Sequence, residues 1–428
     1  MTAEVAVLNR IGIALAADSA VTIGREAEKI YASADKLFQL HASAPVGVMI
    51  FGSASIVGMP WETVIKAFRK QIGSERYPTL DDYARSFHSF LNAPSNLFPE
   101  ASQDRHAIGG LGANLFLDLR DKLKNVIDKT IGDGEDVTDK SIAKICKKVF
   151  EERLALIRKR PELDGFGEID RRTIRKKYSK QLRKLRTEIF GSLPISRQGV
   201  GILNAIVSEM LTRHYFGPMR GGIVISGFGE DEYLPRLVAF DIEEFACGRV
   251  RIVKNREMAI SNDNLGAVVP FAQQEMVQAF MEGVDRNLMN HIISSTKEIF
   301  HGAMSAIVST MEKVNPDIHD KLEKEVVPAQ RKALKSLIDN WGQCSQNFWQ
   351  PVVEIVSSLP KDELAAMAES LVNLTKFRRR VTRVRETVGG PIDVAVITKG
   401  DGFVWVSRKH YFPAELNPRA MAKYQNGD

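Results

Sequence analysis

The second residue of the chain could act as a catalytic nucleophile. Thr2 becomes the first residue when Met1 is removed, and its small side chain is compatible with that removal. A terminal threonine combines a hydroxyl with an α-amine, whose ordinary pKa is about 7.7–8.0. The amine can accept the hydroxyl proton directly or through water. One residue could therefore supply both the nucleophile and the general base.

Asp18 and Lys36 could set the electrostatics around such a nucleophile. Asp18 ends the apolar run 12–17, which is typical of a buried strand. An ionised carboxylate there needs a paired charge or several hydrogen-bond donors. Lys36 follows another strand-like segment and is a candidate partner. The ordinary alternatives are that Thr2 is a plain chain start and that Asp18 is a turn or cap residue.

Strand-like and helix-like segments alternate in blocks along the chain. Alternating or continuous short apolar runs bounded by turn residues indicate strands, and longer amphipathic segments indicate helices. We expect an α+β fold in which helices cover antiparallel sheets. The expected order is strands at 2–60, helices at 80–215, strands at 221–254, a helix at 270–284, further helices to about 380, and a closing hairpin at 392–407.

The start of the chain, with residues 2–7, residues 12–19, Thr22 and Gly24, resembles the mature start of a proteasome β subunit. In that family the catalytic threonine precedes an aspartate by sixteen residues, as Thr2 precedes Asp18 here. Lys36-Leu37-Phe38 resembles the lysine strand of the family, and Phe51-Gly52-Ser53-Ala54 resembles its glycine turn. Downstream, 223–241 resembles the middle hairpin, Pro270 begins the third main helix, and 389–402 resembles the closing hairpin.

The resemblance implies the four-layer αββα sandwich of N-terminal-nucleophile hydrolases. The expected organisation is a single domain over residues 1–428, because the matching segments come from its start, middle and end. The excess length then forms a basic helical insertion at 80–215 and a second helical insertion at 285–385.

The resemblance also assigns catalytic roles. Thr2 would be the nucleophile, Asp18 and Lys36 would support it, and the backbone N–H of Gly52 would contribute to the oxyanion hole. The family's Asp-x-x-Ser-Gly-Gly stretch is one residue shorter here, so that Glu386 could replace the aspartate and Thr387 could supply a hydroxyl, with the match ambiguous by one position. The family's serine before the third helix has no equivalent in the stretch 266–269.

A substrate-binding strand is implied in the same way. Thr22 would pair its backbone with an extended peptide, as in strand addition. Val21, Ala34, Ile50 and Ala54 fall near the side-chain pocket, and these apolar residues predict an apolar residue before the scissile bond. The alternative is that these four residues belong only to the core.

The predicted function is that of a threonine-type endopeptidase, cleaving peptide or unfolded-protein substrates after Met1 removal. One alternative is a weak or inactive scaffold whose helical insertions bind a protein or a nucleic acid. A second alternative is an amidase acting on small molecules. The family resemblance further implies that the chain forms a homo-oligomer, because members of the family assemble into rings. It also implies a separate ATPase or regulatory partner.

The positive charge is concentrated in one segment. The 428 residues carry a formal net charge of +6, and residues 121–190 hold 20 Lys+Arg against 13 Asp+Glu, which is +7. The run Arg171–Arg186 contains nine basic residues and no acid. Such a run could bind a nucleic acid or another anionic partner. It is also typical of a solvated helix face.

The composition excludes several other classes of protein. With 44% hydrophobic and 26% charged residues, the chain is typical of globular proteins, and its apolar runs are too short to cross a bilayer. Three scattered cysteines form neither a disulfide framework nor a zinc motif, and no targeting peptide is visible, which favours the cytoplasm. No metal motif or phosphate-binding glycine loop is present, so no cofactor is expected.

Overall fold

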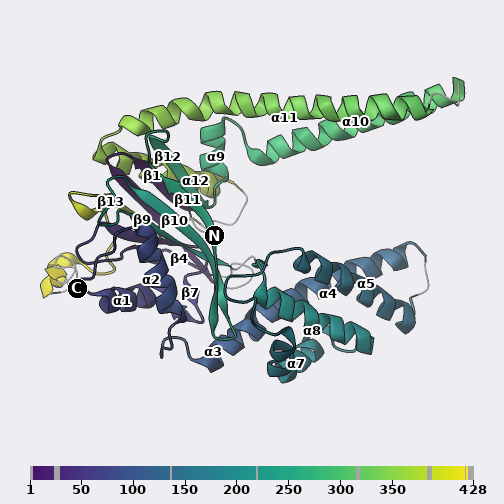
Figure 1. Ribbon diagram of the computed structural model, residues 1–428, viewed down its shortest axis with the longest axis horizontal. Helices are drawn as coiled ribbons and strands as arrows, with labels where there is room; N and C mark the ends of the chain where they lie inside the picture. Colours follow the sequence, from purple (N-terminus) through teal and green to yellow (C-terminus); the bar gives the residue numbers. More distant parts are fainter. Residues whose placement is uncertain are drawn as a thin grey trace. The chain divides into compact units, whose positions relative to one another are not determined.

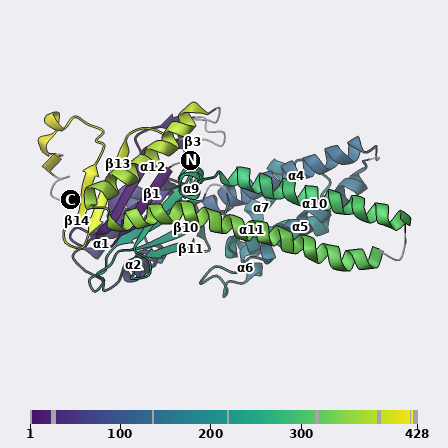
Figure 2. The same cartoon turned by 90° about the horizontal axis from the view of Figure 1, so that it is seen from above.

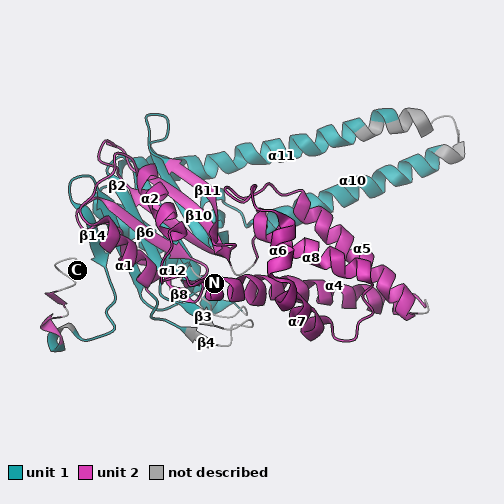
Figure 3. Ribbon diagram, turned by 60° about the horizontal axis from the view of Figure 1, so that its bottom comes forward, with its two compact units in different colours: residues 1–34, 259–416 teal, residues 35–258, 417–428 magenta. Residues whose placement is uncertain are grey.

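The computed structural model describes residues 3–23, 29–134, 137–217, 220–314, 319–382, 388–419 and 421–422. The chain divides into two compact units, coloured teal and magenta in Figure 3. Unit 1 holds residues 1–34 and 259–416, and unit 2 holds residues 35–258 and 417–428. Each unit combines an antiparallel sheet with helices, which makes the chain a mixed α/β protein. The single domain with insertions at 80–215 and 285–385 stays a prediction.

The sheet of unit 1 brings together strands from both ends of the sequence. Ala3 pairs with Ala272, Glu4 pairs with Ala17, and Asp18 pairs with Ile392. The start of the first strand and the end of the second therefore lie at the same end of the sheet. In spatial order the strands are β12 (Gly266–Ala272), β1 (Ala3–Asn9), β2 (Gly12–Asp18), β13 (Ile392–Thr398) and β14 (Gly402–Ser407), each antiparallel to its neighbour.

Helices pack on the apolar residues of this sheet. α12 (Lys361–Val381) lies against β1, β2 and β13, and α9 (Glu275–Glu282) lies against α12. Alternate strand residues such as Val5, Val7 and Val394 form one cluster with Leu364 and Leu371 of α12. α12 thus packs on the sheet although it falls within the range 285–385 for which an insertion is predicted.

The predicted helix at 270–284 begins later than expected. Pro270 and Phe271 belong to β12, and α9 starts only at Glu275. The prediction treated Pro270 as the first residue of a helix. β12 is an edge strand of the sheet, and proline is tolerated on such a strand because it lacks only an N–H that has no ladder partner. Gln273 and Gln274 are the residues directly before α9.

The sheet of unit 2 comes from the middle of the chain. α1 (Trp61–Ile72) and α2 (Leu80–Asn92) supply apolar side chains to its core, including Phe68 and Phe87. Thr79 and Asp82 cap the start of α2 reciprocally, as a capping box does. In spatial order the strands are β11 (Arg249–Ala259), β10 (Arg236–Ala246), β9 (Gly221–Gly227), β6 (Val46–Phe51) and β5 (Leu37–Gln39).

Within the range 2–60, for which strands are predicted, the segment 29–40 contributes two separate strands. β4 (Lys29–Tyr31) pairs with β3 (Val21–Ile23) as a separate ribbon, and β5 pairs with β6. The intervening residues 32–36 are irregular. Two shorter strands, β7 (Ser55–Ile56) and β8 (Met59–Pro60), pair with each other before α1.

A helical block with its own core completes unit 2. Phe116, Phe150 and Phe190 pack together inside it. A π-helix at His106–Gly112 joins α3 to α4. The helices of this block are α3 (Glu100–Arg105), α4 (Ala113–Gly132), α5 (Asp139–Arg158), α6 (Arg171–Lys177), α7 (Ser179–Phe190) and α8 (Arg197–Thr212).

The basic run Arg171–Arg186 forms α6 and most of α7, and part of its charge is used inside the unit. Arg171 forms ion pairs with Glu162 and Glu209. Lys177 lies 2.8 Å from a carboxylate oxygen of Glu100 and 3.0 Å from one of Asp104. These two cations therefore hold neighbouring helices, and the anionic-partner surface stays a prediction for the others.

The longest helices of unit 1 form a hairpin. α10 (Arg286–Val314) and α11 (His319–Ser358) run side by side in opposite directions, as Figures 1 and 2 both show. The inner end of α11 packs against β12 and β1. Within the described parts of the chain, no helix is sufficiently long and apolar to span a membrane.

Candidate functional site

The Asp18 carboxylate collects three backbone N–H groups at one end of the unit 1 sheet. The side chain is only 1% exposed. Its Oδ1 accepts from Ala3 at 3.1 Å, and its Oδ2 accepts from Ala20 at 3.2 Å and from Gly389 at 2.9 Å. Because charge-assisted hydrogen bonds to backbone amides are strong, the carboxylate fixes the start of β1 and the turn before β13 together.

The turn before β13 is tied to the residue after Asp18. Ser19 donates its N–H to the Gly389 carbonyl at 3.1 Å and its hydroxyl to the Pro391 carbonyl at 2.7 Å. Gly390 has φ +77°, and a Cβ there would lie 2.8 Å from that of Ala32. The Lys376 ammonium of α12 donates to the Gly390 carbonyl at 2.8 Å. A glycine is required at this position, and the closing segment is rigidly placed.

Asp18→Asn is expected to lower the free energy of unfolding by roughly 1–3 kcal/mol, because one amide NH₂ would face backbone donors that need an acceptor. Urea unfolding measured by circular dichroism checks this. Asp121→Asn is the matched control, since that side chain is 65% exposed and should change stability by less than about 0.5 kcal/mol. Equal stability of the two variants would contradict the role given to Asp18.

The structure describes only three of the five predicted catalytic residues, and these belong to two different units. Lys36 belongs to unit 2 and is 3% exposed, and its carbonyl accepts the N–H of Ile50 at 2.9 Å. Gly52 lies in the turn after β6 with φ +74°. Thr2 and Glu386 lie outside the described residues. The joint site formed by Thr2, Asp18, Lys36, Gly52 and Glu386 stays a prediction.

The turn at Gly52 can accept no side chain without rearrangement. A Cβ there would lie 2.4 Å from the carbonyl oxygen of Arg220, and the positive φ disfavours other residues. Ser53 closes the same turn by donating its hydroxyl to the carbonyl of Ser55 at 2.8 Å. The backbone conformation of this turn is therefore tightly constrained.

Gly52→Ala is expected to destabilise the protein by at least about 2 kcal/mol, since a backbone clash adds to the roughly 1–2 kcal/mol cost of positive φ. Gly248→Ala is the matched control, because Gly248 has φ +79° and open space around its Cβ position. The free energy of unfolding of this control should fall only by the roughly 1–2 kcal/mol that a positive φ costs. Thermal unfolding of both variants measures the difference, and equal losses would contradict the clash.

The predicted substrate-binding residues differ in exposure. Val21 and Ala34 are half-buried and belong to unit 1. Ile50 is buried, and Ala54 is exposed, both in unit 2. Thr22 pairs with Ile30 in the β3–β4 ribbon, and its side chain is outside the description. Of these residues, only Ile50 joins a described core cluster.

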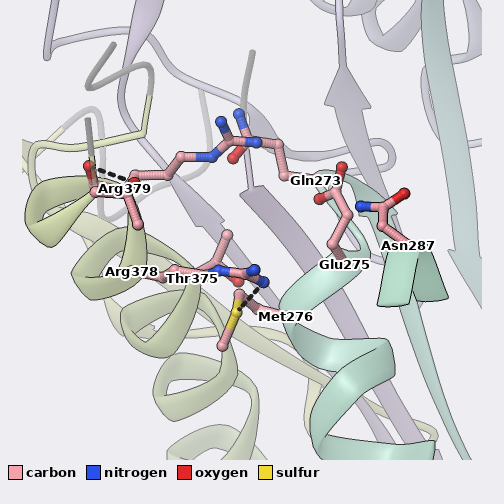
Figure 4. A pocket seen from close by; sticks show the side chains of 8 residues that line it. Gln273, Glu275, Met276, Asn287, Thr375, Arg378 and Arg379 are labelled. Carbon is pink, nitrogen blue, oxygen red and sulfur yellow. Dashed lines mark hydrogen bonds between the residues drawn. The ribbon is translucent and has the colours of Figure 1, made fainter. Parts of the chain in front are cut away.

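A cavity of about 230 Å³ opens in unit 1 between the start of α9 and the end of α12 (Figure 4). Arg378 lies 3.1 Å from Asp285, and its guanidinium holds the pKa of that carboxyl below the ordinary value. Figure 4 shows the Arg379 side chain extending from α12 toward Gln273. The lining residues are Gln273, Glu275, Met276, Asn287, Thr375, Arg378, Arg379 and Thr382.

This cavity was not predicted from the sequence. Gln273 follows Ala272, which pairs with Ala3. The cavity therefore lies at the end of the sheet where β1 begins. The sequence gives no signal for it, because the cavity depends on the pairing of β12 with β1, and the residues from Pro270 onward predict a helix start instead. Seven of its eight lining side chains carry a polar group, so the cavity could accept a group that hydrogen-bonds with amides and guanidinium ions.

A second cavity, of about 160 Å³, lies beside the Gly52 turn in unit 2. Ser53, Trp61 and Glu244 are among its lining residues. The Glu244 carboxylate accepts the N–H of Val57 at 2.8 Å and lies 3.3 Å from Nδ1 of His106. Burial raises the pKa of Glu244, and the nearby His106 opposes that rise. No local motif marks this pair, because 138 residues separate its members.

The comparisons with known proteins add little to these contacts. No family model and no curated protein matches the chain. A solved structure of the Gly-1 mutant of Anbu from Hyphomicrobium sp. strain MC1 aligns with 99% of this chain and 96% of that chain, at 10% identity and a TM-score of 0.31. A TM-score this low carries no argument about the arrangement of the fold or about any residue of the site.

Proposed function

We propose that this chain is a threonine-type N-terminal-nucleophile hydrolase with the four-layer sandwich of the proteasome β-subunit family. The observation that carries the proposal is the hydrogen bond from the Ala3 N–H to Asp18. Ala3 is bonded directly to Thr2, so the buried carboxylate anchors the first residue after the nucleophile. The sixteen-residue spacing between Thr2 and Asp18 thereby acquires a physical reason.

The proposed reaction is acyl transfer to a hydroxyl. Thr2 Oγ attacks the amide carbonyl while its proton passes to the free α-amine. The C–N bond then breaks, the amine returns the proton to the leaving group, and an ester remains on Thr2. Water hydrolyses the ester and restores the hydroxyl. Roles for Lys36 and for the Gly52 N–H as oxyanion donor rest on the sequence resemblance.

The proposed substrates are peptides or unfolded proteins with an apolar residue before the scissile bond. Val21, Ala34, Ile50 and Ala54 supply the apolar side chains that support this preference. Thr22 lies on the short strand β3, where a peptide could add by backbone pairing.

A non-catalytic scaffold is the competing proposal. The amides of Gln273 and Gln274, rather than hydroxyls, directly precede α9. Groups that orient a nucleophile matter for activity, so this change favours a weak enzyme or a scaffold. The retained set of Thr2, Asp18, Lys36 and Gly52 favours the hydrolase.

Mass spectrometry with a peptidyl epoxyketone tests the proposal, because this electrophile needs both the hydroxyl and the free amine of a terminal threonine. The expected result is loss of Met1 and an adduct on the N-terminal peptide. Protein that retains Met1 serves as the control and should not react. Absence of an adduct in processed protein would support the scaffold. An adduct combined with turnover of small amides but not of a peptide library would indicate the small-molecule amidase.

A further inference from the structure

The hairpin formed by α10 and α11 presents unusually apolar surfaces to solvent. Twelve of the 25 large apolar side chains that are exposed in the described chain lie on these two helices, with exposed fractions from 37% to 69%. They are Leu288, Ile292, Ile299, Phe300, Ile307, Met311, Leu337, Ile338, Trp341, Phe348, Trp349 and Ile355.

These side chains recur at the spacing of a helix–helix seam. Leu337, Trp341, Phe348 and Ile355 are four, seven and seven residues apart, which places them on one face of α11. On α10, Leu288, Ile292 and Ile299 follow the same spacing of four and seven. Other positions such as Met289 and Val356 are the buried ones, and Phe348 stays 58% exposed although it lies against Gly283, so packing within unit 1 leaves most of these stripes uncovered.

Charge is also missing where a solvated helix would carry it. Residues 299–311 of α10 and residues 340–353 of α11 contain no Lys, Arg, Asp or Glu. A helix exposed to water normally has a charged face opposite its apolar face. Two adjacent helices that lack charge over these lengths are typical of segments that are buried in an assembly.

We propose that the hairpin packs against the hairpin of a second copy of this chain, forming an intermolecular four-helix bundle. The seven side chains of the two stripes expose roughly 700 Å² at about 200 Å² per large side chain, and the five apolar side chains beside them raise the exposed apolar surface to roughly 1,000 Å². A stable interface needs about 800 Å² from each partner. Both helices carry a stripe, so a twofold axis can match the same surface to itself.

The charges of the hairpin favour a protein partner over a lipid surface. Its described side chains include six cations (Arg286, Lys297, Lys324, Arg331, Lys332 and Lys335) and four anions (Glu298, Glu325, Asp339 and Glu354). A helix that lies on an anionic membrane has a strongly basic polar face. This near balance instead suits self-association. The pairing concerns assembly and goes beyond the proposed hydrolase activity.

Sedimentation of the full chain tests the proposal. We expect wild-type protein at about 10 µM to have at least twice the 47.7 kDa mass of one chain. The double variant Leu337→Glu and Trp341→Glu should raise the dissociation constant at least 100-fold. The matched control, Tyr233→Glu and Tyr411→Glu, changes side chains that are 86% and 88% exposed outside the hairpin and should associate like wild type.

Cys344 provides an independent readout, because it is exposed on α11 between Trp341 and Phe348. Its alkylation by a maleimide should slow as wild-type concentration rises from 0.1 to 100 µM, and it should stay fast in the hairpin variant. Unchanged circular dichroism shows that the variants are folded. A monomeric wild type, or a variant whose mass and alkylation rate match wild type, would overturn the proposal.

Discussion

Thr2→Ala is expected to reduce hydrolysis of an amide substrate to background, a loss of at least about 10³-fold in kcat/KM. The substitution removes the hydroxyl that attacks the carbonyl and keeps the terminal amine, so no group remains to form the ester. Thr2→Ser keeps a hydroxyl and should retain measurable activity. A fluorogenic peptide with an apolar residue before the scissile bond provides the assay.

The control for this prediction is an exposed threonine elsewhere. Thr63→Ala changes the exposed face of α1 and should leave kcat/KM as in wild type. Intact mass must show that Met1 is removed in every variant, because a retained methionine would block the amine. Unchanged hydrolysis by Thr2→Ala would show that another group performs the reaction.

Arg251→Met is expected to lower the free energy of unfolding by about 3–5 kcal/mol, the usual cost of breaking a buried ion pair. Arg251 is 0% exposed, and its Nη1 lies 2.7 Å from Glu243. It also donates to the carbonyls of Met210, Leu211 and Tyr215 at 2.9, 3.2 and 2.7 Å. These contacts join β11 to the end of α8, where unpaired carbonyls need donors.

The loss arises mainly because Glu243 would remain buried without its cation. Burial already lowers the pKa of Arg251, and the neighbouring carboxylate opposes that effect. The double variant Arg251→Met and Glu243→Met should therefore be more stable than the single one, since no charge is left unpaired. Such a recovery of stability would show that the loss in the single variant comes from the unpaired charge and not from lost packing.

Urea unfolding measures these differences. Lys66→Met is the matched control, because Lys66 and Glu62 form an ion pair in which both side chains are about half exposed. Such surface pairs contribute only about 0–1 kcal/mol, so the control should change little. A loss below about 1 kcal/mol for Arg251→Met would contradict the structural role assigned to this residue.

Several elements could be predicted because their signals are local. The closing hairpin is predicted at 392–407, and β13 and β14 confirm it, since the turn that joins the two strands is encoded directly between them. The end of β2 at Asp18 is likewise confirmed, because the apolar run stops there. The closing hairpin and the strand end at Asp18 were therefore predictable, because both depend on residues that are close in the sequence.

Other features depended on partners far away in the chain. Asp18 accepts a hydrogen bond from the N–H of Gly389, which lies 371 residues later in the chain. No sequence spacing encodes that contact. The cavity beside Gln273 exists because β12 pairs with β1, and the edge position of that strand is what allows Pro270 within it. The Arg251–Glu243 pair was also missed, because charged residues in a strand normally indicate a solvated face.

The sequence by itself determined which chemical groups the proposed site contains. These are a threonine at position 2, an aspartate sixteen residues later, and apolar runs that form the strands around them. Tertiary structure alone decided which backbone groups hold Asp18 and which faces of the long helices remain exposed. The reason is physical. A hydroxyl, an amine or a run of valines acts through its own bonds and its nearest neighbours. A buried carboxylate or an apolar stripe acquires its role only from what packs against it.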